Sequence, residues 1–448
     1  MKIRSRVLAL IAVVLLMSLG LQTASFAESA TKEITITVRK NDWGGRATSF
    51  EEAAVRLNDE LAAAGENTHV TIDWWESIGD DELVLQAQAG RIADVFLNSS
   101  VDIGWEIEAG LIQPIDWVAD SAVFEGVSDQ IMSMMYYNGH YYGVLQDMDA
   151  SPIFINKNIL KNMGMTDDEI AQLVTDINSG NYTMGQLVDL AQQAMEVGGA
   201  KYGFCVEDKR FEGWQGSAGW DNYDESENKL IFDETAIKKL YSFWKDGFDK
   251  GVISEGIGDI DTDMSAQLMI DNEAFCVFAR SEFYRIMADL KGMKISDEAY
   301  QTWFNDNFVW SYIPSMDEGG AVTSFSNPAM LYVGADVDAE KMPYVQRYLE
   351  LMLSPDLQYN HTINSGKLPV TPDALELVME TLPFYAEHYV MTSFTRVRSP
   401  INDYATLIAG YTLGVDAILI EGADVDTAYE YFLNDAQQNI EADSIIYK

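Results

Sequence analysis

The order of hydrophobic and polar positions predicts alternating strands and helices after residue 33. Residues 34–38 alternate, which is typical of a half-buried strand. From Ser49 to about Gly65 the hydrophobic positions recur every three or four residues, and Ser49 with Glu52 fits a helix-opening capping box. The next predicted strand, helix and strand are 70–74, 81–89 and 94–97. This order implies a parallel sheet with right-handed crossovers, whose ligands bind at the carboxyl ends of the strands.

The later sequence continues in the same alternating manner. Further strands are predicted at 151–156, 201–206, 274–278 and 330–333. Helices are predicted to begin at a Thr183–Gln186 capping box, to include 237–244, and to span 343–353, 354–365 and most of the last 75 or so residues. No internal repeat or low-complexity linker separates two halves. Two lobes would therefore share several chain crossings rather than a single tether.

The N-terminus has the features of an export signal. Lys2, Arg4 and Arg6 precede an apolar run over 7–21, and small residues precede Glu28. This run is shorter than the ~20 residues that a membrane-spanning helix needs. We therefore expect residues 1–27 to be cleaved as a signal peptide, with no cysteine after the run for lipid attachment. The protein is expected to be periplasmic or secreted and not lipid-anchored.

Composition and charge limit the classes of partner. The 448 residues contain 29 Lys plus Arg and 71 Asp plus Glu, a formal net charge of −42. This sign argues against nucleic acids and anionic membrane surfaces as partners. Cys205 and Cys276 are too few for a disulfide scaffold or a thiolate zinc site. Export permits a disulfide between them, but their apolar neighbours favour two buried thiols.

Several segments, taken in order, resemble one protein family. They are Ile92–Phe96 with Ala109–Ile115, Tyr141–Leu145 through Ile155–Asn158, Thr183–Leu187, Glu273–Val277, and Ser354–Asp356 through Gly366–Val370. Together they resemble the family 1 extracellular solute-binding proteins, the sugar-binding components of bacterial ABC importers. The likeness spans Ile34 to about Leu433, and the chain departs from the family pattern by lacking a lipid-anchoring cysteine and by its acidity.

The resemblance implies a fold and a function. The fold would be α/β, with two lobes of the periplasmic-binding-protein type, each a mainly parallel sheet flanked by helices, and a ligand cleft at the hinge. We expect crossings near 146–151, 321–327 and 368–371. The lobes would then be 32–147 plus 327–369 and 150–322 plus 372–448. The function would be capture of a sugar or oligosaccharide and its delivery to an ABC permease, by a monomer without cofactor or metal.

Candidate ligand-binding residues combine aromatic rings, which cover the apolar faces of sugars, with short polar side chains, which bind the hydroxyl groups. They are Asn41, Asp42, Trp43, Asn98, Ser99, Asp102, Trp105, Gln146, Asp147, Asp149, Trp214, Arg280, Phe283 and Tyr404. Any single tryptophan could instead pack in the core, and that is the expectation for Trp74 and Trp244. Trp43 and Trp105 have polar neighbours, which favours a binding role.

Two other functions stay open. Acidic and aromatic loops would also suit a cationic or quaternary-ammonium ligand through cation–π contact. A secreted glycoside hydrolase would need a pair of carboxylates, and 71 acidic residues make chance pairs common. The sequence contains no H-E-x-x-H or G-x-S-x-G motif and no phosphate loop, and its four histidines lack metal-ligand spacing. A protein without catalytic activity is therefore the expectation.

Overall fold

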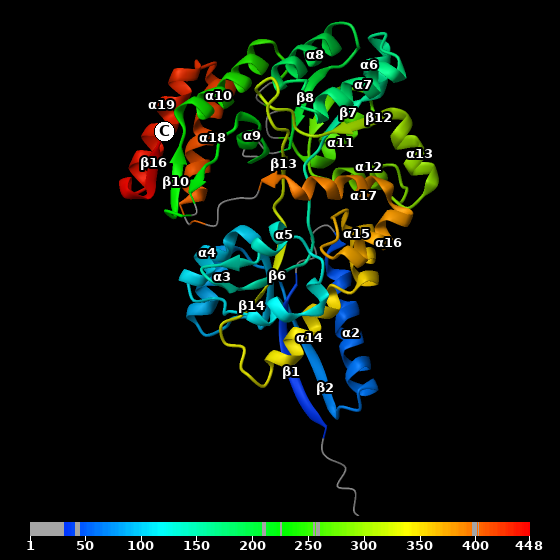
Figure 1. Ribbon diagram of the computed structural model, residues 1–448, viewed down its shortest axis with the longest axis vertical. Helices are drawn as coiled ribbons and strands as arrows, with labels where there is room; N and C mark the ends of the chain where they lie inside the picture. The colour runs from blue at the N-terminus through cyan, green and yellow to red at the C-terminus, as the bar shows by residue number, and fades with distance from the viewer. Residues whose placement is uncertain are drawn as a thin grey trace, which may run out of the picture.

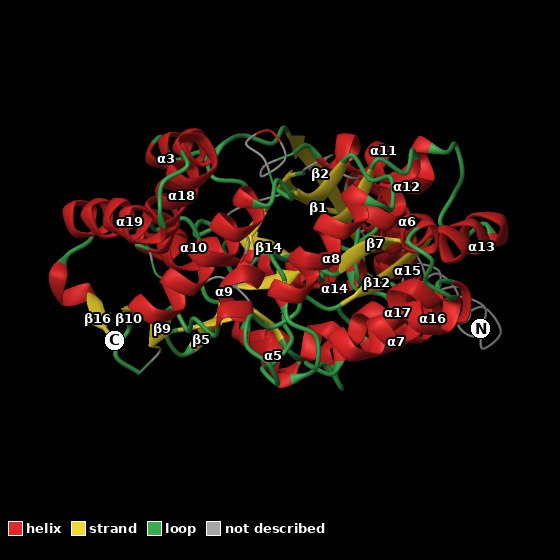
Figure 2. Cartoon of the chain, turned by 90° about the horizontal axis from the view of Figure 1, so that it is seen from above, coloured by secondary structure: helices red, strands yellow, loops and turns green. Residues whose placement is uncertain are grey.

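A computed structural model of the protein describes residues 31–40, 45–207, 212–224, 226–253, 256, 260–396, 401 and 403–448. Two lobes, each built around its own sheet, lie one above the other in Figure 1. Seen from above in Figure 2, helices form much of the periphery and the main strands lie further inside. The predicted signal peptide 1–27 and the predicted site residues Asn41, Asp42 and Trp43 lie outside the described residues.

The first lobe contains a five-stranded sheet in the order β2-β1-β3-β14-β6. The strands are β1 (Lys32–Arg39), β2 (Thr68–Trp75), β3 (Val95–Ser99), β6 (Gly143–Leu145) and β14 (Ala329–Val333). β1 pairs in parallel with β2 and β3, as the sequence predicts. β14 is antiparallel to β3 and β6. β3 ends at the junction between the lobes, whereas β14 starts there, so the two strands run in opposite directions.

The second lobe contains a four-stranded sheet in the order β12-β7-β11-β8. The strands are β7 (Ile153–Asn156), β8 (Tyr202–Val206), β11 (Ala274–Phe278) and β12 (Phe308–Ser311). Only β8 and β11 are parallel, and β7 is antiparallel to both β11 and β12. The sheet is therefore mixed rather than mainly parallel. The reason is that β7 leaves the junction between the lobes, while β8 and β11 run toward it.

Helices surround both sheets. Before β7 they are α2 (Ala47–Ala63), α3 (Asp80–Gln88), η2 (Ser100–Asp102), α4 (Ile103–Glu108), η3 (Asp116–Asp120), η4 (Ala122–Phe124) and α5 (Asp129–Ser133). Between β7 and β14 they are α6 (Lys157–Asn162), α7 (Asp167–Asn178), α8 (Met184–Glu196), α9 (Glu212–Ala218), α10 (Glu234–Asp249), α11 (Thr262–Ile270), α12 (Phe283–Leu290) and α13 (Glu298–Asn307). After β14 they are α14 (Met342–Met352), α15 (Pro355–Ser365), α16 (Pro372–Thr381), α17 (Pro383–Tyr389), η6 (Val390–Ser393), α18 (Tyr404–Glu421), α19 (Val425–Asn439) and η7 (Ala442–Ser444).

Three small sheets complete the described structure. They are β16 (Ile445–Tyr447) with β10 (Lys229–Phe232) and β9 (Tyr223–Asp224), β13 (Ser324–Phe325) with β15 (Thr395–Arg396), and the hairpin of β4 (Tyr136–Tyr137) and β5 (His140–Tyr141). β16 pairs in parallel with β10, and this pairing places the C-terminus in the second lobe (Figure 1).

Local sequence signals explain where the helices begin. Thr183 and Gln186 form the predicted capping box at α8. The sequence predicts that Ser49 caps the N-terminus of α2, but the helix begins at Ala47 and its N-cap is Arg46. Ser49 instead lies in the first turn, where its hydroxyl donates to the Arg46 carbonyl at 3.1 Å. The predicted apolar face of α2 is buried, as expected.

Apolar residues form two large clusters, one that extends from the first lobe into part of the second and one within the second lobe. In the second lobe, Trp214, Trp220 and Trp244 are among the largest fully buried side chains, which confirms the core prediction for Trp244. The core prediction for Trp74 is wrong, since it is 36% exposed on the edge strand β2, with the Lys40 ammonium 5.4 Å from its ring centroid. Cys205 and Cys276 are buried free thiols, consistent with the interpretation that their apolar neighbours favour.

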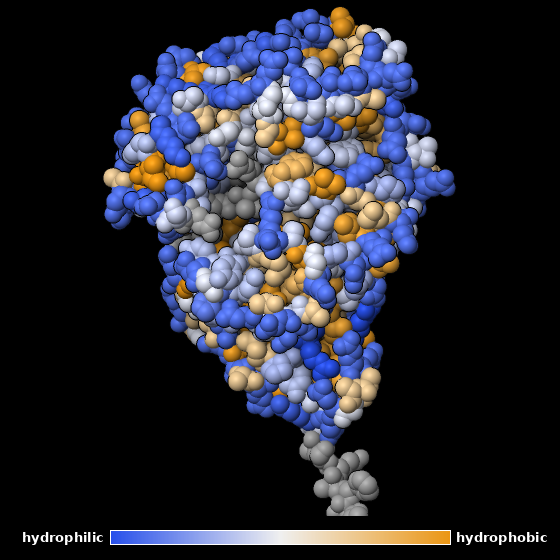
Figure 3. All heavy atoms as spheres, viewed as in Figure 1, coloured by the Kyte–Doolittle hydropathy of each residue, from blue (hydrophilic) through white to orange (hydrophobic). Residues whose placement is uncertain are grey.

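The outer surface is mostly polar. Hydrophilic residues dominate the face of both lobes that Figure 3 shows, in keeping with the charge of −42. Within the described residues one helix, α18, is long and apolar enough to cross a membrane by length and composition. Of its 18 residues 56% are buried, and it packs against α10 and α19. Burial in the second lobe accounts for its apolar composition.

The chain passes between the lobes more than once. It leaves the first sheet after β6 and enters the second at β7, then returns from β12 and β13 to β14. A later segment, after α15, lies against the first crossing. There Met148 and Leu368 exchange two backbone hydrogen bonds of 2.9 and 2.7 Å. The crossing segments are thus tied to one another where the lobes meet.

Candidate functional site

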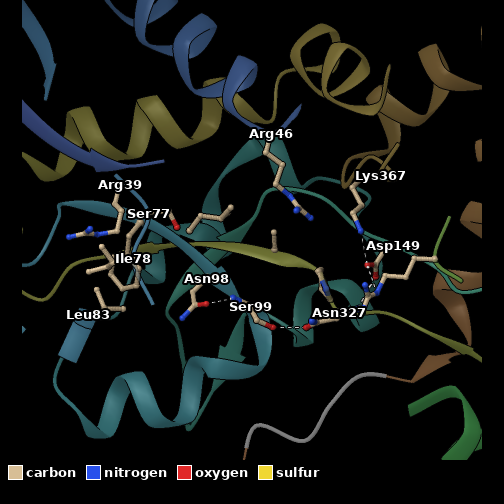
Figure 4. Close-up of a pocket in the computed structure, with 15 residues that line it drawn as sticks. Arg39, Arg46, Ser77, Ile78, Leu83, Asn98, Ser99, Asp149, Asn327 and Lys367 are labelled. Atoms are coloured by element: carbon tan, nitrogen blue, oxygen red, sulfur yellow. Dashed lines mark hydrogen bonds and ion pairs between the residues drawn. The ribbon is translucent and has the colours of Figure 1, made fainter. Parts of the chain in front are cut away.

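A cavity of about 300 Å³ lies where the crossing segments meet the first sheet. It is at the carboxyl ends of β1, β2 and β3, the edge at which the sequence predicts ligand binding. Its lining residues are Arg39, Arg46, Ser77, Ile78, Leu83, Phe96, Leu97, Asn98, Ser99, Asp149, Arg280, Asn327, Pro328, Ala329 and Lys367. Figure 4 shows Arg39 at one end of this group and Lys367 with Asp149 at the other. Both lobes and the crossings between them therefore contribute to its wall.

Asp149 joins three segments at this cavity. Its Oδ1 accepts hydrogen bonds from the Ser326 hydroxyl and the Asn327 backbone N–H, each at 2.8 Å. Its Oδ2 lies 3.2 Å from Lys367 Nζ and 3.9 Å from Arg280 Nε. Burial alone would raise the pKa of Asp149, but the charges of Lys367 and Arg280 and the hydrogen bonds lower it below its ordinary value. Asp149 is therefore a carboxylate at neutral pH.

Asp147 lies behind the cavity wall and orients Arg46. The Asp147 carboxylate accepts a hydrogen bond from Arg46 Nε at 2.9 Å and lies 2.9 Å from His361 Nε2. The side chains of Asp147 and His361 are both buried. Burial alone would raise the pKa of Asp147, but Arg46 and His361 lower it well below its usual range. Arg46 also lines the cavity and is the N-cap of α2. Figure 4 shows its side chain extending from the end of that helix toward the middle of the lining group.

Arg280 and Lys367 have carboxylate partners on the second lobe. Arg280 Nη1 is 3.1 Å from Glu207 Oε1, and Lys367 forms a close ion pair with Glu282. Burial raises the pKa of Glu207, although Arg280 acts in the opposite direction. Neither glutamate lines the cavity. These pairs hold two long cationic side chains in place at the junction of the lobes.

Arg39 is the cation at the other end of the cavity. It is 6% exposed; its Nη1 donates to the Glu76 carbonyl at 2.6 Å and its Nη2 to the Gln86 side-chain oxygen at 2.8 Å. Burial lowers the pKa of Arg39 from its ordinary value. Two smaller effects oppose each other, since Glu82 raises this pKa and Arg91 lowers it. Within the described part of the chain Arg39 forms no ion pair with a carboxylate, and its Nε has no hydrogen-bond partner.

Four of the residues predicted from the sequence line the cavity: Asn98, Ser99, Asp149 and Arg280. Asn98 Nδ2 donates to Glu106 at 2.9 Å, and the Ser99 hydroxyl donates to the Asn327 side chain. The first contact connects the end of β3 with α4, and the second connects it with the second crossing. Gln146 and Asp147 are fully buried next to the cavity, where Gln146 binds Ser49 at 3.0 Å. Their role is to hold the first crossing against α2.

Five other predicted residues are not in the cavity lining. Trp214 is fully buried, with its ring centroid 4.5 Å from that of Phe278, and Phe283 is fully buried 4.7 Å from Phe154. Tyr404 begins α18 and accepts a hydrogen bond from Gln215 in the second-lobe core. Trp105 packs against the first-lobe core from α4, and Asp102 is the N-cap of that helix. The three aromatic residues of the second lobe are therefore core residues in this structure, because apolar neighbours enclose their rings.

The most informative residues that the sequence analysis missed are basic. Arg39, Arg46 and Lys367 line the cavity, whereas the predicted sugar site consists mainly of aromatic and short polar side chains, with Arg280 as its one basic member. Arg39 is the last residue of β1, so its position at a strand end was a usable signal. Arg46 and Lys367 depend on contacts between distant segments. Within the described residues no group of three or more His, Cys, Asp or Glu side chains could hold a metal ion.

Comparisons with known proteins agree with this architecture. A sequence model of the family "Bacterial extracellular solute-binding protein" matches residues 60–388. A solved structure of the GacH receptor of Streptomyces glaucescens, studied with acarbose, is 16% identical with a TM-score of 0.70, covering 93% of this chain and 100% of that one. Maltose-bound MalE3 of T. maritima is also 16% identical, with a TM-score of 0.71 and coverage of 90% and 99%. No curated protein matches the sequence.

A third solved structure, the cyclic alpha-maltosyl-1,6-maltose binding protein from Arthrobacter globiformis, gives a TM-score of 0.68 at 16% identity, covering 91% of this chain and 98% of that one. At such low identity these likenesses show the fold. The predicted α/β fold with two lobes and a junction between them is confirmed, and the cavity lies at that junction.

Proposed function

The chain belongs to the family of bacterial extracellular solute-binding proteins, and we propose that it captures a sugar or oligosaccharide and delivers it to the permease of an ABC importer. The single observation that carries this proposal is the cavity built jointly by β-strand ends of the first lobe, by Arg280 of the second lobe and by the crossings. The names of three structurally similar proteins refer to acarbose, maltose or a cyclic maltosyl sugar.

The lining of the cavity supports binding without chemistry. A solute held by both lobes makes its full set of contacts only when the lobes close, so binding favours the closed form. A glycoside hydrolase would need two carboxylates flanking the bond. Among the described lining residues Asp149 is the one acidic side chain, and its lowered pKa keeps it ionised and unable to act as a general acid at neutral pH. The family and the structural neighbours are binding proteins.

A cationic solute fits the cavity poorly. Its lining places Arg39, Arg46, Arg280 and Lys367 around the space that the solute would occupy. A quaternary ammonium group would meet four like charges there, and Phe96 is the one aromatic side chain among the described lining residues. This alternative therefore loses the support that the acidic composition gave it.

The proposal also covers the division of the chain into two lobes and the location of the protein outside the cytoplasm. The lobes are 32–147 plus 327–369 and 150–322 plus 372–448, a division supported by the membership of β6, β7 and β14 in the two sheets. The signal segment 1–27 directs export, and the product is a periplasmic or secreted monomer without a lipid anchor. Cell fractionation and light scattering test location and mass. Recovery of the protein only in the culture medium would argue against a periplasmic receptor.

The decisive experiment measures binding and closure together. A thermal-shift screen with a carbohydrate panel, followed by calorimetry on each hit, identifies the ligand. Small-angle scattering of the same samples should then show a smaller radius of gyration with ligand than without it. A hydrolysed oligosaccharide, seen as new reducing ends, would overturn the binding-protein assignment, and binding with an unchanged radius would overturn lobe closure.

A further inference from the structure

The charge of the cavity lining is opposite to the charge of the protein. In the whole chain 29 side chains are basic and 71 acidic, yet among the described residues that line the cavity four of the five charged ones are basic. These four come from separate segments: the end of β1, the start of α2, the turn after β11 and the turn after α15. The acid-rich composition of the chain does not by itself explain this cluster of basic residues. The field of the whole protein disfavours an anion, so a site for one needs a local concentration of positive charge.

Asp149, which lies close to Lys367 and Arg280, lines the cavity, whereas the other carboxylate partners of these cations are not among its described lining residues. Asp147 pairs with Arg46, Glu207 with Arg280, and Glu282 with Lys367. None of these three acids lines the cavity. Pairing offsets the cost of burying the cations and fixes their geometry. A solute would therefore meet the basic members of the pairs, with Asp149 as the one carboxylate among the described lining residues.

Arg39 adds an independent observation. Its guanidinium is buried and binds a carbonyl and an amide oxygen, and no carboxylate among the described residues forms an ion pair with it. A buried charge of this kind is costly unless it is paired. Its Nε, which has no partner among the same residues, is one more donor at the end of the cavity. An anionic group on the solute would supply the missing negative charge.

The N-termini of two helices also favour an anion at the cavity. Arg46 caps α2, and Arg280 lies three residues before α12. Neither helix has an acidic residue in its first turn. The positive end of each helix dipole therefore lies beside a cavity-lining cation, although the N-cap of α12, Glu282, partly offsets it. Among the described lining residues Phe96 is the one aromatic side chain that could cover the apolar face of a neutral sugar.

We propose that the solute of this cavity is anionic, namely a saccharide that carries a carboxylate or sulfate group facing Arg39, Arg46, Arg280 and Lys367. This inference rests on the proposed sugar-binding function and narrows its ligand class. Guanidinium groups bind carboxylate and sulfate oxygens through charge-assisted hydrogen bonds, which are about twice as strong as neutral ones. The hydroxyl groups of the same saccharide would be left to Asn98, Ser99 and Asn327.

The test uses pairs of probes that differ only in charge. Calorimetry compares D-glucuronate with D-glucose, digalacturonate with its methyl ester, and a sulfated disaccharide with its unsulfated parent, at low and high salt. The expected result is at least about tenfold tighter binding of a charged member, weakening as salt rises. Equal or tighter binding of the neutral members overturns the inference and leaves the sugar-binding function intact. Binding of acetate, phosphate or sulfate alone, without any saccharide, supports the anionic site and overturns the sugar-binding function.

Variants of the lining residues test whether the anion binds in this cavity. R39Q and R280Q should each weaken binding of the charged probe by about tenfold or more, and by more than they weaken binding of its matched neutral probe. The matched control is K201Q, which removes one positive charge from an exposed pair with Glu273 on the second lobe and should leave both affinities unchanged. Melting temperatures show whether each variant is folded. If folded R39Q and R280Q both bind the charged probe as the wild type does, or if no charged probe binds, the inference is wrong.

Discussion

The Lys367 ammonium lies 3.2 Å from the Asp149 carboxylate and joins two crossing segments that are 218 residues apart in the sequence. Both side chains are at most 3% exposed. Lys367 also pairs with Glu282 of the second lobe, and Asp149 also binds Ser326 and Asn327. One buried ion pair thus connects the first and last crossings with the segment that returns to β14. Its loss should affect the whole junction.

We expect Lys367→Met to destabilise the unliganded protein by about 3–5 kcal/mol, because it leaves Asp149 and Glu282 buried with one cation fewer. Urea unfolding measures the free energy directly. Lys201→Met is the control, since it breaks the exposed pair with Glu273 and should cost less than about 1 kcal/mol. Equal effects of the two substitutions would contradict the importance of the buried pair.

Acid should destabilise the protein through Asp147 and Asp149. Both have folded-state pKa values below the ordinary value, since buried cations outweigh the opposing effect of burial. The unfolded chain binds these protons near pH 3.9, whereas the folded chain resists them. The stabilisation is therefore fully present above about pH 4 to 5 and is lost as the pH falls below that window toward the folded-state values.

The measurement for this pH dependence is urea unfolding at pH 7, 5, 4 and 3. Asp149→Asn should be less stable than the wild type at pH 7. Its free energy of unfolding should fall less on acidification, because asparagine cannot take up the proton that Asp149 binds when the chain unfolds. Glu273→Gln, at an exposed site, should follow the wild-type slope. Parallel pH curves for Asp149→Asn and wild type would show that Asp149 has an ordinary pKa.

Trp214→Ala should act on stability and not on ligand recognition. The Trp214 ring centroid is 4.5 Å from that of Phe278 and 5.1 Å from that of Phe243, and the residue is fully buried. Truncating such a side chain typically costs about 3–5 kcal/mol. Trp74→Ala, on the exposed edge of β2, should change stability by less than about 1 kcal/mol. A folded Trp214→Ala protein that has lost ligand binding selectively would restore Trp214 as a binding residue.

A methyl group at Gly414 should disturb the packing of α18. A Cβ atom there would clash with the Tyr241 ring and would lie 2.7 Å from the Ala428 carbonyl oxygen, so Gly414→Ala should destabilise by about 1–3 kcal/mol. In α8, Gly185 has only Thr183 Oγ1 within reach, at 3.9 Å, and Gly185→Ala should be neutral or stabilising by up to about 1 kcal/mol. Thermal unfolding of the pair gives the answer, and a stable Gly414→Ala protein would show that α18 can move away.

The sequence predicted elements better than it predicted the site. Periodicity located β1, β2, β3, β8 and β11 and the face of α2, because each depends on neighbours close in sequence. Strand direction in the second sheet escaped it, since β7 is antiparallel only because of where the chain enters the lobe. The site requires contacts over long separations, such as that of Arg46 with Asp147. Composition could not show that Trp214 is enclosed by Phe243 and Phe278 while Arg46 faces a cavity.

The position of β14 inside the first sheet, between β3 and β6, has a consequence for how the protein is made. Synthesis delivers β14 only after every strand of the second sheet, so β3 and β6 keep unpaired edges until then. The second lobe is also incomplete until the end of the chain is synthesised, because α18 and α19 pack against α10. A chain cut short before Ala329 therefore completes neither lobe and presents open strand edges, the surfaces on which chains aggregate. Truncated products should be cleared by proteases and not persist as half-molecules.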